Sequence, residues 1–364
     1  MMRIAIECSP LVAPPFSGIA RCTRQMILAL AQAQDTQLTL CCPNSAQYRR
    51  HRRALPSAAN IEVRPSLPGW PLWRDKTYDI GFLSFNRDLP PRIRAPRVLW
   101  LHDFYLHWGY SNLDPVLRLG RMADMARVYA AASHFICISK ASRQDALLFL
   151  PVQEDQLHLV PEGVGPDFSP ATAAQRAALR ARLGQARPYF LFVGMATENK
   201  NLARLLAAFA ASPLQQEMDL LIAGSLPPQH PDVLRLRQQI AQFGLGNTVK
   251  LVGKVSDTDL VTLYSEAAAY VFPSFCEGFG LPMLEAMRCG TPVLTASRSA
   301  CAEVALGHAE LADPFSVEDL GRGLRSVLGR TQSQRDAARA YAQDMSWARA
   351  AGELRAVFEK IAGS

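Results

Sequence analysis

The feature that most constrains this chain is a repeated alternation of short apolar segments with longer helical segments. The apolar segments are typical of strands buried on both faces of a parallel sheet. In the first half, strands are predicted at residues 3–7, 37–41, 61–64, 78–84, 97–101 and 134–138, with helices at 18–33, 116–132 and 140–150. This alternation predicts βαβ units and an α/β fold.

The alternation starts again near residue 188, where Pro188-Tyr-Phe-Leu-Phe-Val-Gly194 predicts the first strand of a second sheet. Further strands are expected at 219–223, 248–252, 269–272 and 292–295, and helices at 201–211, 232–243, 257–268, 282–289 and 317–328. Residues 161–170 hold three prolines and two glycines, which is typical of a linker. We therefore expect two Rossmann-like, doubly wound domains with a hinge near 161–187, facing each other across a ligand-binding cleft.

The net charge of +7 indicates an anionic partner. Much of the excess in the first half lies in Tyr48-Arg-Arg-His-Arg-Arg-Ala-Leu55, and two interpretations stay open for it: a mobile basic loop, or a contact with anionic lipid headgroups. The segment Leu67-Pro-Gly-Trp-Pro-Leu-Trp73 is either ordinary packing or part of the same contact. No aromatic interleaving or RNA-binding signature is present, so no nucleic acid is expected as a partner.

Eight cysteines show no C-x-x-C pair and no spacing typical of zinc sites. Several lie in apolar runs such as Phe135-Ile-Cys-Ile138, which predicts buried thiols in a reducing compartment. A strand is expected almost at the first residue, and no apolar run approaches the roughly 18 residues of a membrane span. These features predict a cytoplasmic protein that at most lies on the inner face of the cytoplasmic membrane.

Most of the chemistry is expected in one segment, Phe275-Cys-Glu-Gly-Phe-Gly-Leu-Pro-Met-Leu-Glu285. It follows an apolar strand and opens a helix with Pro282 in the first turn, where proline's missing N–H costs nothing. Gly278 and Gly280 let the backbone approach a ligand, so its N–H groups and the helix dipole favour a phosphate.

The two glutamates of this segment have separate expected roles. Glu285, taken to lie in the first helical turn, is suited to accept both hydroxyls of a ribose, whereas Glu277 reaches the sugar beyond the phosphates. The spacing E-x7-E alone is weak evidence, and a second interpretation is that Glu285 merely complements the helix dipole.

The segment resembles the donor-binding signature of the retaining GT-B glycosyltransferases of family 4, also called group 1. Residues 194–202 and several other motifs resemble the family's in the same order: Pro15-Phe-Ser-Gly-Ile-Ala-Arg21, Val98-Leu-Trp-Leu-His-Asp103, Ile136-Cys-Ile-Ser-Lys-Ala-Ser142, Val160-Pro-Glu-Gly-Val164, Gly253-Lys-Val-Ser256 and Gly290-Thr-Pro-Val293. The resemblance implies an acceptor-binding domain at 1–167 and a donor-binding domain at 168–345. Residues 346–364, with Trp347, resemble the family's closing helix, which crosses back onto the N-terminal domain.

The resemblance also implies roles for single residues. His102, Glu277 and Lys200 are expected to be catalytic, with His102 facing the donor sugar and Lys200 neutralising the diphosphate. The remaining donor-binding residues would be Gly18, Lys254, Val255, Gly278, Phe279, Gly280, Leu281 and Glu285, and the acceptor-binding residues Arg21 and Asp103. Each also has an ordinary interpretation, such as a turn glycine, a core histidine or a solvated lysine.

Two positions depart from the family's pattern. The family usually places an arginine beside the lysine, at positions that hold Met195 and Asn199 here. Either another basic residue such as Arg21 substitutes for it, or the leaving group is stabilised less. Glu162 stands where the family has asparagine.

The function that the resemblance implies is transfer of a hexosyl group, mannose or a deoxymannose, from a nucleoside-diphosphate sugar to a glycan or lipid-linked acceptor, with retention. The donor is expected to be GDP-linked in preference to UDP-linked, as in assembly of bacterial O-antigen, lipopolysaccharide and exopolysaccharide. No D-x-D motif in a metal-binding context is present. Lys200 and the helix terminus are therefore expected to stabilise the leaving phosphate without a metal or other cofactor.

Two alternatives stay open: a sugar-nucleotide epimerase of the GT-B type, and a non-catalytic nucleotide-sugar-binding subunit. They would differ from a transferase in their products, since one would release epimerised sugar and the other would bind nucleotide without reaction. A dinucleotide-dependent redox enzyme is not expected, because no strand-linked G-x-G-x-x-G with an acidic partner is present.

Overall fold

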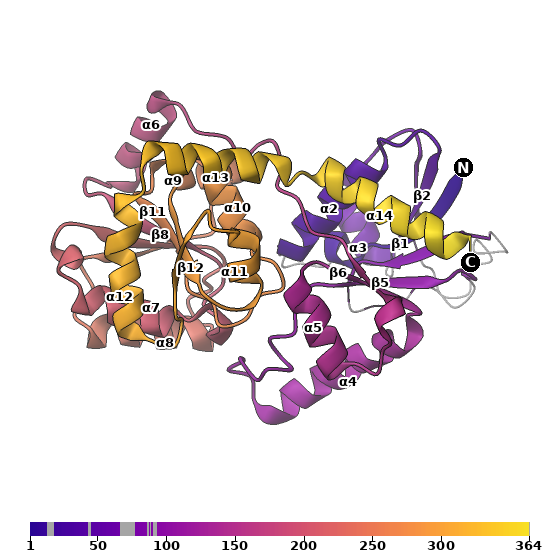
Figure 1. Cartoon of the computed structure of the whole chain (residues 1–364), viewed down its shortest axis with the longest axis horizontal. Coiled ribbons are helices and arrows are strands. Elements are labelled where there is room, and N and C mark those ends of the chain that lie inside the picture. Colours follow the sequence, from indigo (N-terminus) through magenta and orange to yellow (C-terminus); the bar gives the residue numbers. More distant parts are fainter. Residues whose placement is uncertain are drawn as a thin grey trace. The chain divides into compact units, whose positions relative to one another are not determined.

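The computed structural model describes residues 1–12, 18–42, 45–65, 77–85, 87, 89 and 93–363. Its contacts divide the chain into two compact units (Figure 1). The first unit contains Met1–His102, Asp114–Gly163 and Ser346–Ser364, and the second contains Asp103–Leu113 and Val164–Met345. Each unit holds its own parallel sheet.

In the first unit, the described residues form a sheet of seven strands in the order β3-β2-β1-β4-β5-β6-β7. The strands are β1 (Met2–Glu7), β2 (Thr36–Cys42), β3 (Ile61–Pro65), β4 (Ile80–Leu83), β5 (Arg97–Leu101), β6 (His134–Cys137) and β7 (Leu157–Leu159). Ile4 of β1 lies opposite Leu38 on one side and Ile80 on the other. The order reverses between β1 and β4, and in open α/β sheets ligands bind beside the carboxyl ends of the strands at such a point.

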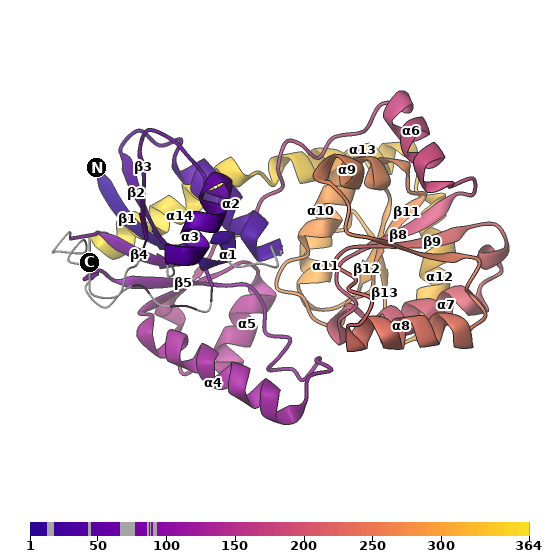
Figure 2. The same ribbon diagram turned by 180° about the vertical axis from the view of Figure 1, so that it is seen from behind.

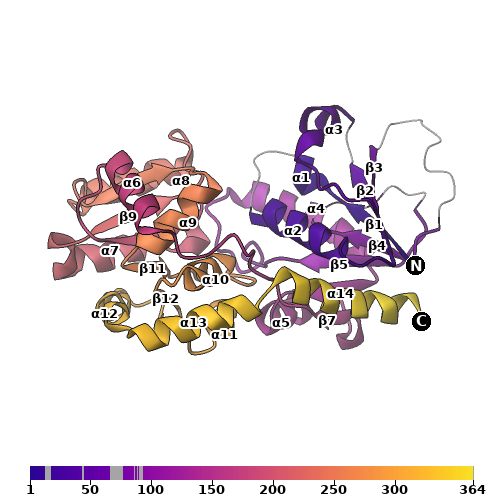
Figure 3. The same ribbon diagram turned by 90° about the horizontal axis from the view of Figure 1, so that it is seen from above.

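Helices cover both faces of this first sheet. They are α1 (Ser9–Val12), α2 (Gly18–Leu30), α3 (Ser45–His51), α4 (Pro115–Ala131), α5 (Lys140–Phe149) and α14 (Trp347–Ala362), with short 3-10 turns η1 (Arg52–Ala54) and η3 (Glu154–Gln156). The C-terminal helix α14 packs against α2 and β4 (Figure 3). Phe358 of α14 meets Phe82 of β4 edge to face, with ring centroids 5.4 Å apart, so the last helix completes the core of the first unit.

The second unit repeats the same topology. Its described residues form a six-stranded sheet in the order β10-β9-β8-β11-β12-β13. The strands are β8 (Tyr189–Val193), β9 (Asp219–Ala223), β10 (Val249–Gly253), β11 (Ala269–Phe272), β12 (Val293–Ala296) and β13 (Glu310–Ala312). The order reverses between β8 and β11, and both strands consist of apolar residues buried on both faces.

The helices of the second unit also form two layers. They are α6 (Ala173–Leu183), α7 (Leu202–Ala211), α8 (Pro231–Gln242), α9 (Asp257–Glu266), α10 (Leu281–Arg288), α11 (Ser299–Ala305), α12 (Val317–Ser326) and α13 (Gln332–Asp344), with 3-10 turns η4 (Glu198–Lys200), η5 (Pro213–Gln216) and η6 (Val327–Gly329). Helix α7 contacts α8 and α12 on one side of the sheet, and α10 contacts α9 and α13 on the other (Figure 2).

Asp103–Leu113 follows β5 of the first unit in the chain but belongs to the second unit. Tyr110 stacks on Phe275, with ring centroids 5.1 Å apart. The side chain of Asn112 donates a hydrogen bond to the Asp232 carboxylate at 2.8 Å. The roles expected above stay predictions: acceptor binding for residues 1–167, donor binding for 168–345 and a closing helix for 346–364.

The alternating pattern is confirmed as two parallel-sheet units, but two sequence-based expectations are wrong and two short strands were missed. The interpretation of residues 48–55 as a mobile basic loop is wrong, because they form the end of α3 and the turn η1 and end at the buried Leu55. A hinge over 161–187 is too wide, because Thr172 caps α6 at its start and Gly184, with φ 59°, ends it. The strands β7 and β13 were not predicted, since each has three residues and shows little periodicity.

Burial of the thiols is confirmed, because all eight cysteines are free and buried. Across the part of the chain that the structure describes, no helix combines the length and apolar character needed to cross a membrane.

Candidate active site

The glycine-rich segment lies where β11 meets α10, beside the reversal of strand order. Gly280 precedes the helix with φ 104°, and an added Cβ would lie 2.5 Å from Cε of Met283. This position therefore requires glycine, and Pro282 occupies the first turn as expected. Gly278, Phe279 and Gly280 are buried, and Leu281 is half-buried.

The position of Glu285 corrects one expectation. Helix α10 begins at Leu281, so Glu285 lies in the second turn and not in the first. A role as a complement to the helix dipole is therefore wrong, since that effect is confined to the first turn. Glu285 is 5% exposed and accepts a hydrogen bond from the Tyr264 hydroxyl at 2.9 Å. Its contact with a ribose stays a prediction.

Two of the predicted catalytic residues form a direct ion pair. Lys200 Nζ lies 2.7 Å from Oε1 of Glu277, although the residues are 77 positions apart in the chain. Their side chains are 19% and 12% exposed, respectively. Lys200 follows β8 and Glu277 follows β11, so the pair lies at the carboxyl ends of the two strands between which the order reverses.

Backbone and amide hydrogen bonds hold these two loops together. The backbone carbonyl of Asn199 accepts from the N–H of Phe275 at 2.8 Å, and its side chain donates to the carbonyl of Cys276 at 3.4 Å. Asn201, with φ 58°, donates to the carbonyls of Pro273 and Pro314 at 3.0 and 2.7 Å. The buried Asn199 thus links the two loops of the site by hydrogen bonds. This gives a structural reason for an amide at a position where the family usually has arginine.

The sequence analysis did not identify Asn201 and Arg204 as residues of this site. Asn201 is buried and adopts a left-handed conformation, which asparagine tolerates. The motif Asn199-Lys-Asn201 indicates this structural role only after the fold is known. The Arg204 guanidinium lies over the rings of Phe275 and Phe315, at 5.1 and 5.9 Å from their centroids. It belongs to the first turn of α7, just beyond Lys200.

Lys254 and Val255 lie in the turn between β10 and α9, where Ser256 caps the helix by accepting from the N–H of Asp259 at 3.1 Å. Lys254 is exposed and Val255 half-buried. Their role in donor binding stays a prediction. Among the described residues, no group of three His, Cys, Asp or Glu side chains could hold a metal ion.

The motif Pro15-Phe-Ser-Gly-Ile-Ala-Arg21 of the first unit is only partly described. Gly18 begins α2, and a Cβ at this position would meet no described atom within 4 Å; residues 15–17 of the motif, like 67–73, lie outside the described residues. Arg21 lies on α2, and Asp103 belongs to the second unit. The acceptor-binding roles of Arg21 and Asp103 stay predictions.

His102 belongs to a buried polar cluster at the carboxyl ends of the first sheet's strands, made of Glu7, Ser84, His102 and Glu162. Nε2 of His102 lies 2.9 Å from the Ser84 carbonyl, and Nδ1 lies 3.5 Å from Oε1 of Glu162. The Ser84 hydroxyl donates to the Glu7 carbonyl at 2.6 Å and lies 3.4 Å from its carboxylate. Sequence reasoning found His102 and the unusual Glu162 but not their contact.

Glu7 is the most deeply buried carboxyl group of this cluster. Burial raises its pKa to about 7, although the hydrogen bonds from Ser9 and the charge of Arg87 oppose the change. Glu7 follows the apolar residues of β1, and its Oε1 accepts from the N–H of Ser9 at 2.7 Å.

Comparison with known proteins identifies the family. The model of the family described as "Glycosyl transferases group 1" matches residues 176–345. The O-antigen chain mannosyltransferase B of Escherichia coli is 30% identical over 294 residues, which cover 78% of this chain and 75% of that protein. The chain belongs to the group 1 glycosyltransferases.

Other relatives of this group 1 glycosyltransferase match over different shares of their length. The serotype-specific mannosyltransferase WbdA of Escherichia coli is 29% identical over 76% of this chain, but the match covers 36% of WbdA, so the chain spans about a third of that relative. Anabaena HepE, solved with UDP and glucose, superposes with a TM-score of 0.76 at 19% identity over 99% of this chain and 100% of HepE. The lipopolysaccharide glycosyltransferase WaaG superposes with a TM-score of 0.69 at 17% identity over both whole chains. These likenesses show the GT-B fold, with its two Rossmann-like domains.

Proposed function

We propose that this glycosyltransferase moves a hexosyl group, mannose or a deoxymannose, from a nucleoside-diphosphate sugar to a glycan or lipid-linked acceptor, with retention of configuration. The observation that carries the proposal is the ion pair of Lys200 and Glu277 beside the start of α10. This arrangement joins a cation, a carboxylate and the start of a helix at one sheet edge.

The chemistry of the donor explains why these groups belong together. As the glycosidic bond breaks, negative charge develops on the leaving phosphate and positive charge on the anomeric carbon. The Lys200 ammonium and the backbone N–H groups of residues 279–281 are suited to the phosphate. A part-buried cation acts more strongly than one in water, because the local dielectric constant is lower.

Glu277 has two tasks in this proposal. Before the donor binds, its carboxylate neutralises Lys200 and holds the ammonium at 2.7 Å. When the donor binds, Lys200 exchanges this partner for the diphosphate, and Glu277 accepts hydroxyls of the donor sugar. The leaving phosphate oxygen then serves as base for the acceptor hydroxyl, on the face from which the nucleotide departs.

The donor is proposed to be GDP-linked because several relatives carry mannosyltransferase names. A thermal-shift screen over GDP, UDP, ADP and dTDP tests the base, since a ligand at 100 times its Kd stabilises the folded state by about 2.7 kcal/mol. A transfer assay with GDP-mannose and GDP-linked deoxymannose follows, with UDP-glucose as comparison. Release of an epimerised free sugar without transfer, or nucleotide binding without reaction, would contradict the proposal.

Retention and independence from metal are separate parts of the proposal. NMR of the purified product shows the anomeric configuration, and an inverted product would contradict retention. Because Lys200 and the start of α10 are proposed to take the place of a metal, transfer is expected to continue in excess EDTA. Loss of transfer that Mg²⁺ or Mn²⁺ restores would contradict this part alone.

A peripheral contact with the cytoplasmic membrane face is proposed for α3 and η1. Arg49, Arg50, Arg52 and Arg53 are exposed on these elements, and each basic residue near an anionic surface contributes about 1 kcal/mol. Co-sedimentation with vesicles that contain anionic lipid should weaken with added salt and in the variant with all four arginines changed to glutamine. Binding that is equal in neutral vesicles would contradict an electrostatic contact.

A further inference from the structure

The buried pair of His102 and Glu162 has chemistry that the proposed function does not use. The two side chains are 8% and 4% exposed, and His102 Nδ1 is 3.5 Å from Glu162 Oε1. No residue of the described chain donates a hydrogen bond to this oxygen. A buried carboxylate oxygen without a donor is costly, so the nearest ring nitrogen is the group able to satisfy it.

The second ring nitrogen decides where the protons are. Nε2 of His102 lies 2.9 Å from the backbone carbonyl of Ser84, and a carbonyl only accepts. Nε2 therefore carries a hydrogen. If Nδ1 carried none, its lone pair would face the lone pairs of a carboxylate. One further proton on Nδ1 removes this repulsion and gives the Glu162 carboxylate oxygen its donor.

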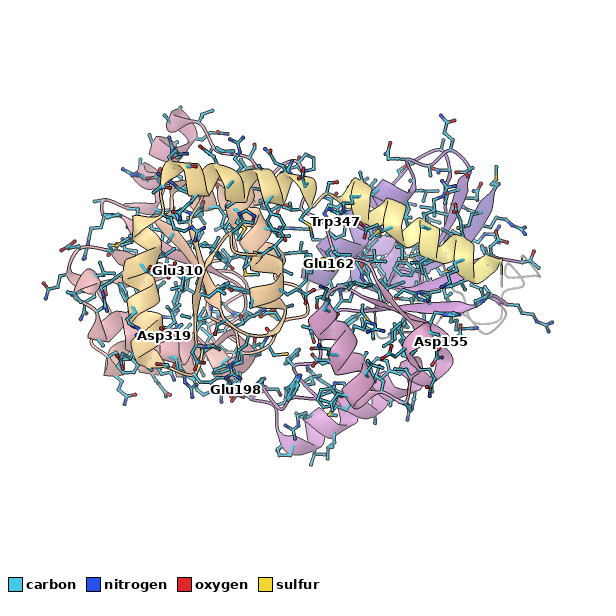
Figure 4. The ribbon with its side chains drawn as sticks, in the orientation of Figure 1. Asp155, Glu162, Glu198, Glu310, Asp319 and Trp347 are labelled. Atoms are coloured by element: carbon cyan, nitrogen blue, oxygen red, sulfur yellow. The ribbon has the colours of Figure 1, made fainter. Side chains whose placement is uncertain are left out.

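The surroundings hold both side chains in place. The Trp100 ring lies 4.7 Å from the His102 ring between centroids, and the Phe85 ring lies 6.2 Å from it. Next to Glu162, a Cβ on Gly163 would lie 2.3 Å from the backbone of Ser346 and Trp347, so the chain contacts the start of α14 directly. Glu162 and Trp347 are both labelled in Figure 4. The other titratable group of the cluster is Glu7, which lies beyond Ser84.

We propose that Glu162 is a positioning residue for His102. The pair shares one proton, and Glu162 sets the orientation and the charge of the imidazole that serves transfer. An asparagine amide at this position, as in the resembling family, would offer its N–H to a neutral Nδ1 and would need no proton on the ring nitrogen. The glutamate thus holds on His102 a proton that an asparagine does not need, and this inference rests on the proposed function only for the catalytic role that the family resemblance implies for His102.

A double-mutant cycle tests the coupling. Glu162→Gln is expected to lower kcat on the order of tenfold, with the KM for the donor unchanged, and Glu162→Asp, which keeps the charge, to lose less. In the His102→Ala background, Glu162→Gln should cause no further loss. Asp155→Asn, at an exposed carboxylate of the same unit, is the matched control and should match the wild type. Losses of Glu162→Gln and His102→Ala that simply multiply would overturn the proposal.

A spectroscopic test does not depend on activity. In the ¹⁵N-histidine spectrum of the full chain, the Nδ1 resonance of His102 should move from the protonated toward the unprotonated position in Glu162→Gln, while Nε2 stays protonated. An Nδ1 resonance that is the same in both proteins would overturn the pairing. If the wild type transfers no sugar from any donor, the proposed function fails, and the spectrum still decides whether the pair shares a proton.

Discussion

The two units place carboxyl groups at corresponding ends of their sheets but neutralise them in different ways. In the second unit Glu277 is paired with the Lys200 ammonium, and the pair is 12% and 19% exposed. In the first unit Glu7 is fully buried with a pKa raised to about 7, and Glu162 faces an imidazole. One sheet edge therefore balances charge with a cation, and the other balances charge with protons.

This difference has consequences for function and for pH. An ammonium that is paired with a carboxylate is able to exchange that partner for a phosphate, which suits a site that binds and releases an anionic donor. A cluster whose charge is balanced by protons has no lysine ammonium to exchange for a phosphate, and its stability depends on pH. The same strand order thus supports two kinds of site, because topology places the strand ends and the side chains decide the chemistry.

The largest effect is expected from removing the ion pair of the second unit. Lys200→Ala and Glu277→Ala should each lower kcat about 10²- to 10³-fold, because removal of one electrostatic stabiliser of a transition state typically costs this much. Transfer from the true donor at saturation is the measurement. Glu198→Gln, at the exposed neighbour labelled in Figure 4, is the control and should keep the wild-type rate. Near wild-type transfer in both alanine variants would show that the Lys200–Glu277 ion pair is not needed for transfer, and the proposed difference in function between the two sheet edges would fail.

A second variant tests the backbone that forms the sheet edge of the second unit. A Cβ on Gly224 would lie 2.1 Å from the carbonyl oxygen of Gly194, and φ is 138°. Gly224→Ala should therefore lower the free energy of unfolding by about 3 kcal/mol, measured by urea denaturation. Gly246→Ala, where the added atom meets nothing within 4 Å, is the control. Equal stability of the two variants would show that the close contact is not needed.

The buried Glu7 of the first unit should make the free energy of unfolding depend on pH. The unfolded chain loses the Glu7 proton near its ordinary pKa of 4.5, whereas the folded chain keeps it up to about pH 7. Between these values the folded state binds more protons, so the free energy of unfolding falls as pH rises, by about 3 kcal/mol in all.

Glu7→Gln imitates the protonated carboxyl group and should flatten this dependence, with its largest gain over the wild type above about pH 7. Urea denaturation from about pH 5 to about pH 8 measures it, with the exposed Asp155→Asn as control. If the wild type and Glu7→Gln show the same slope against pH, Glu7 is not neutral in the folded chain.

The smallest effect is expected when the hydroxyl groups of two buried tyrosines of the second unit are removed. The Tyr264 hydroxyl donates to the Glu285 carboxylate at 2.9 Å, and the Tyr189 hydroxyl donates to the Leu263 carbonyl at the same distance. Tyr264→Phe should cost about 2 kcal/mol and Tyr189→Phe about 1 kcal/mol, because bonds to charged acceptors contribute more. Urea denaturation of the two variants measures the difference. A larger loss of unfolding free energy in Tyr189→Phe than in Tyr264→Phe would show that the hydrogen bond from Tyr264 to Glu285 adds no extra stability.

The sequence by itself predicts the α/β class, the two sheets and the glycine-rich turn before α10. These features are local: strand and helix periodicity, and the need for glycine at Gly280, are properties of a few neighbouring residues. The resemblance of the motifs adds the family, which the comparisons confirm. Short strands such as β7 and the helical form of the basic segment at 48–55 have weak local patterns and were not predicted.

Only the tertiary structure decides which distant groups meet. The order of strands brings Lys200 to Glu277 across 77 residues, whereas long-range packing joins His102 to Glu162 and places Asp103–Leu113 in the second unit. It also places Glu285 in the second turn of α10, beside Tyr264. Local patterns determine the elements, but the partners and charge states of buried polar groups depend on long-range packing, which no local pattern contains.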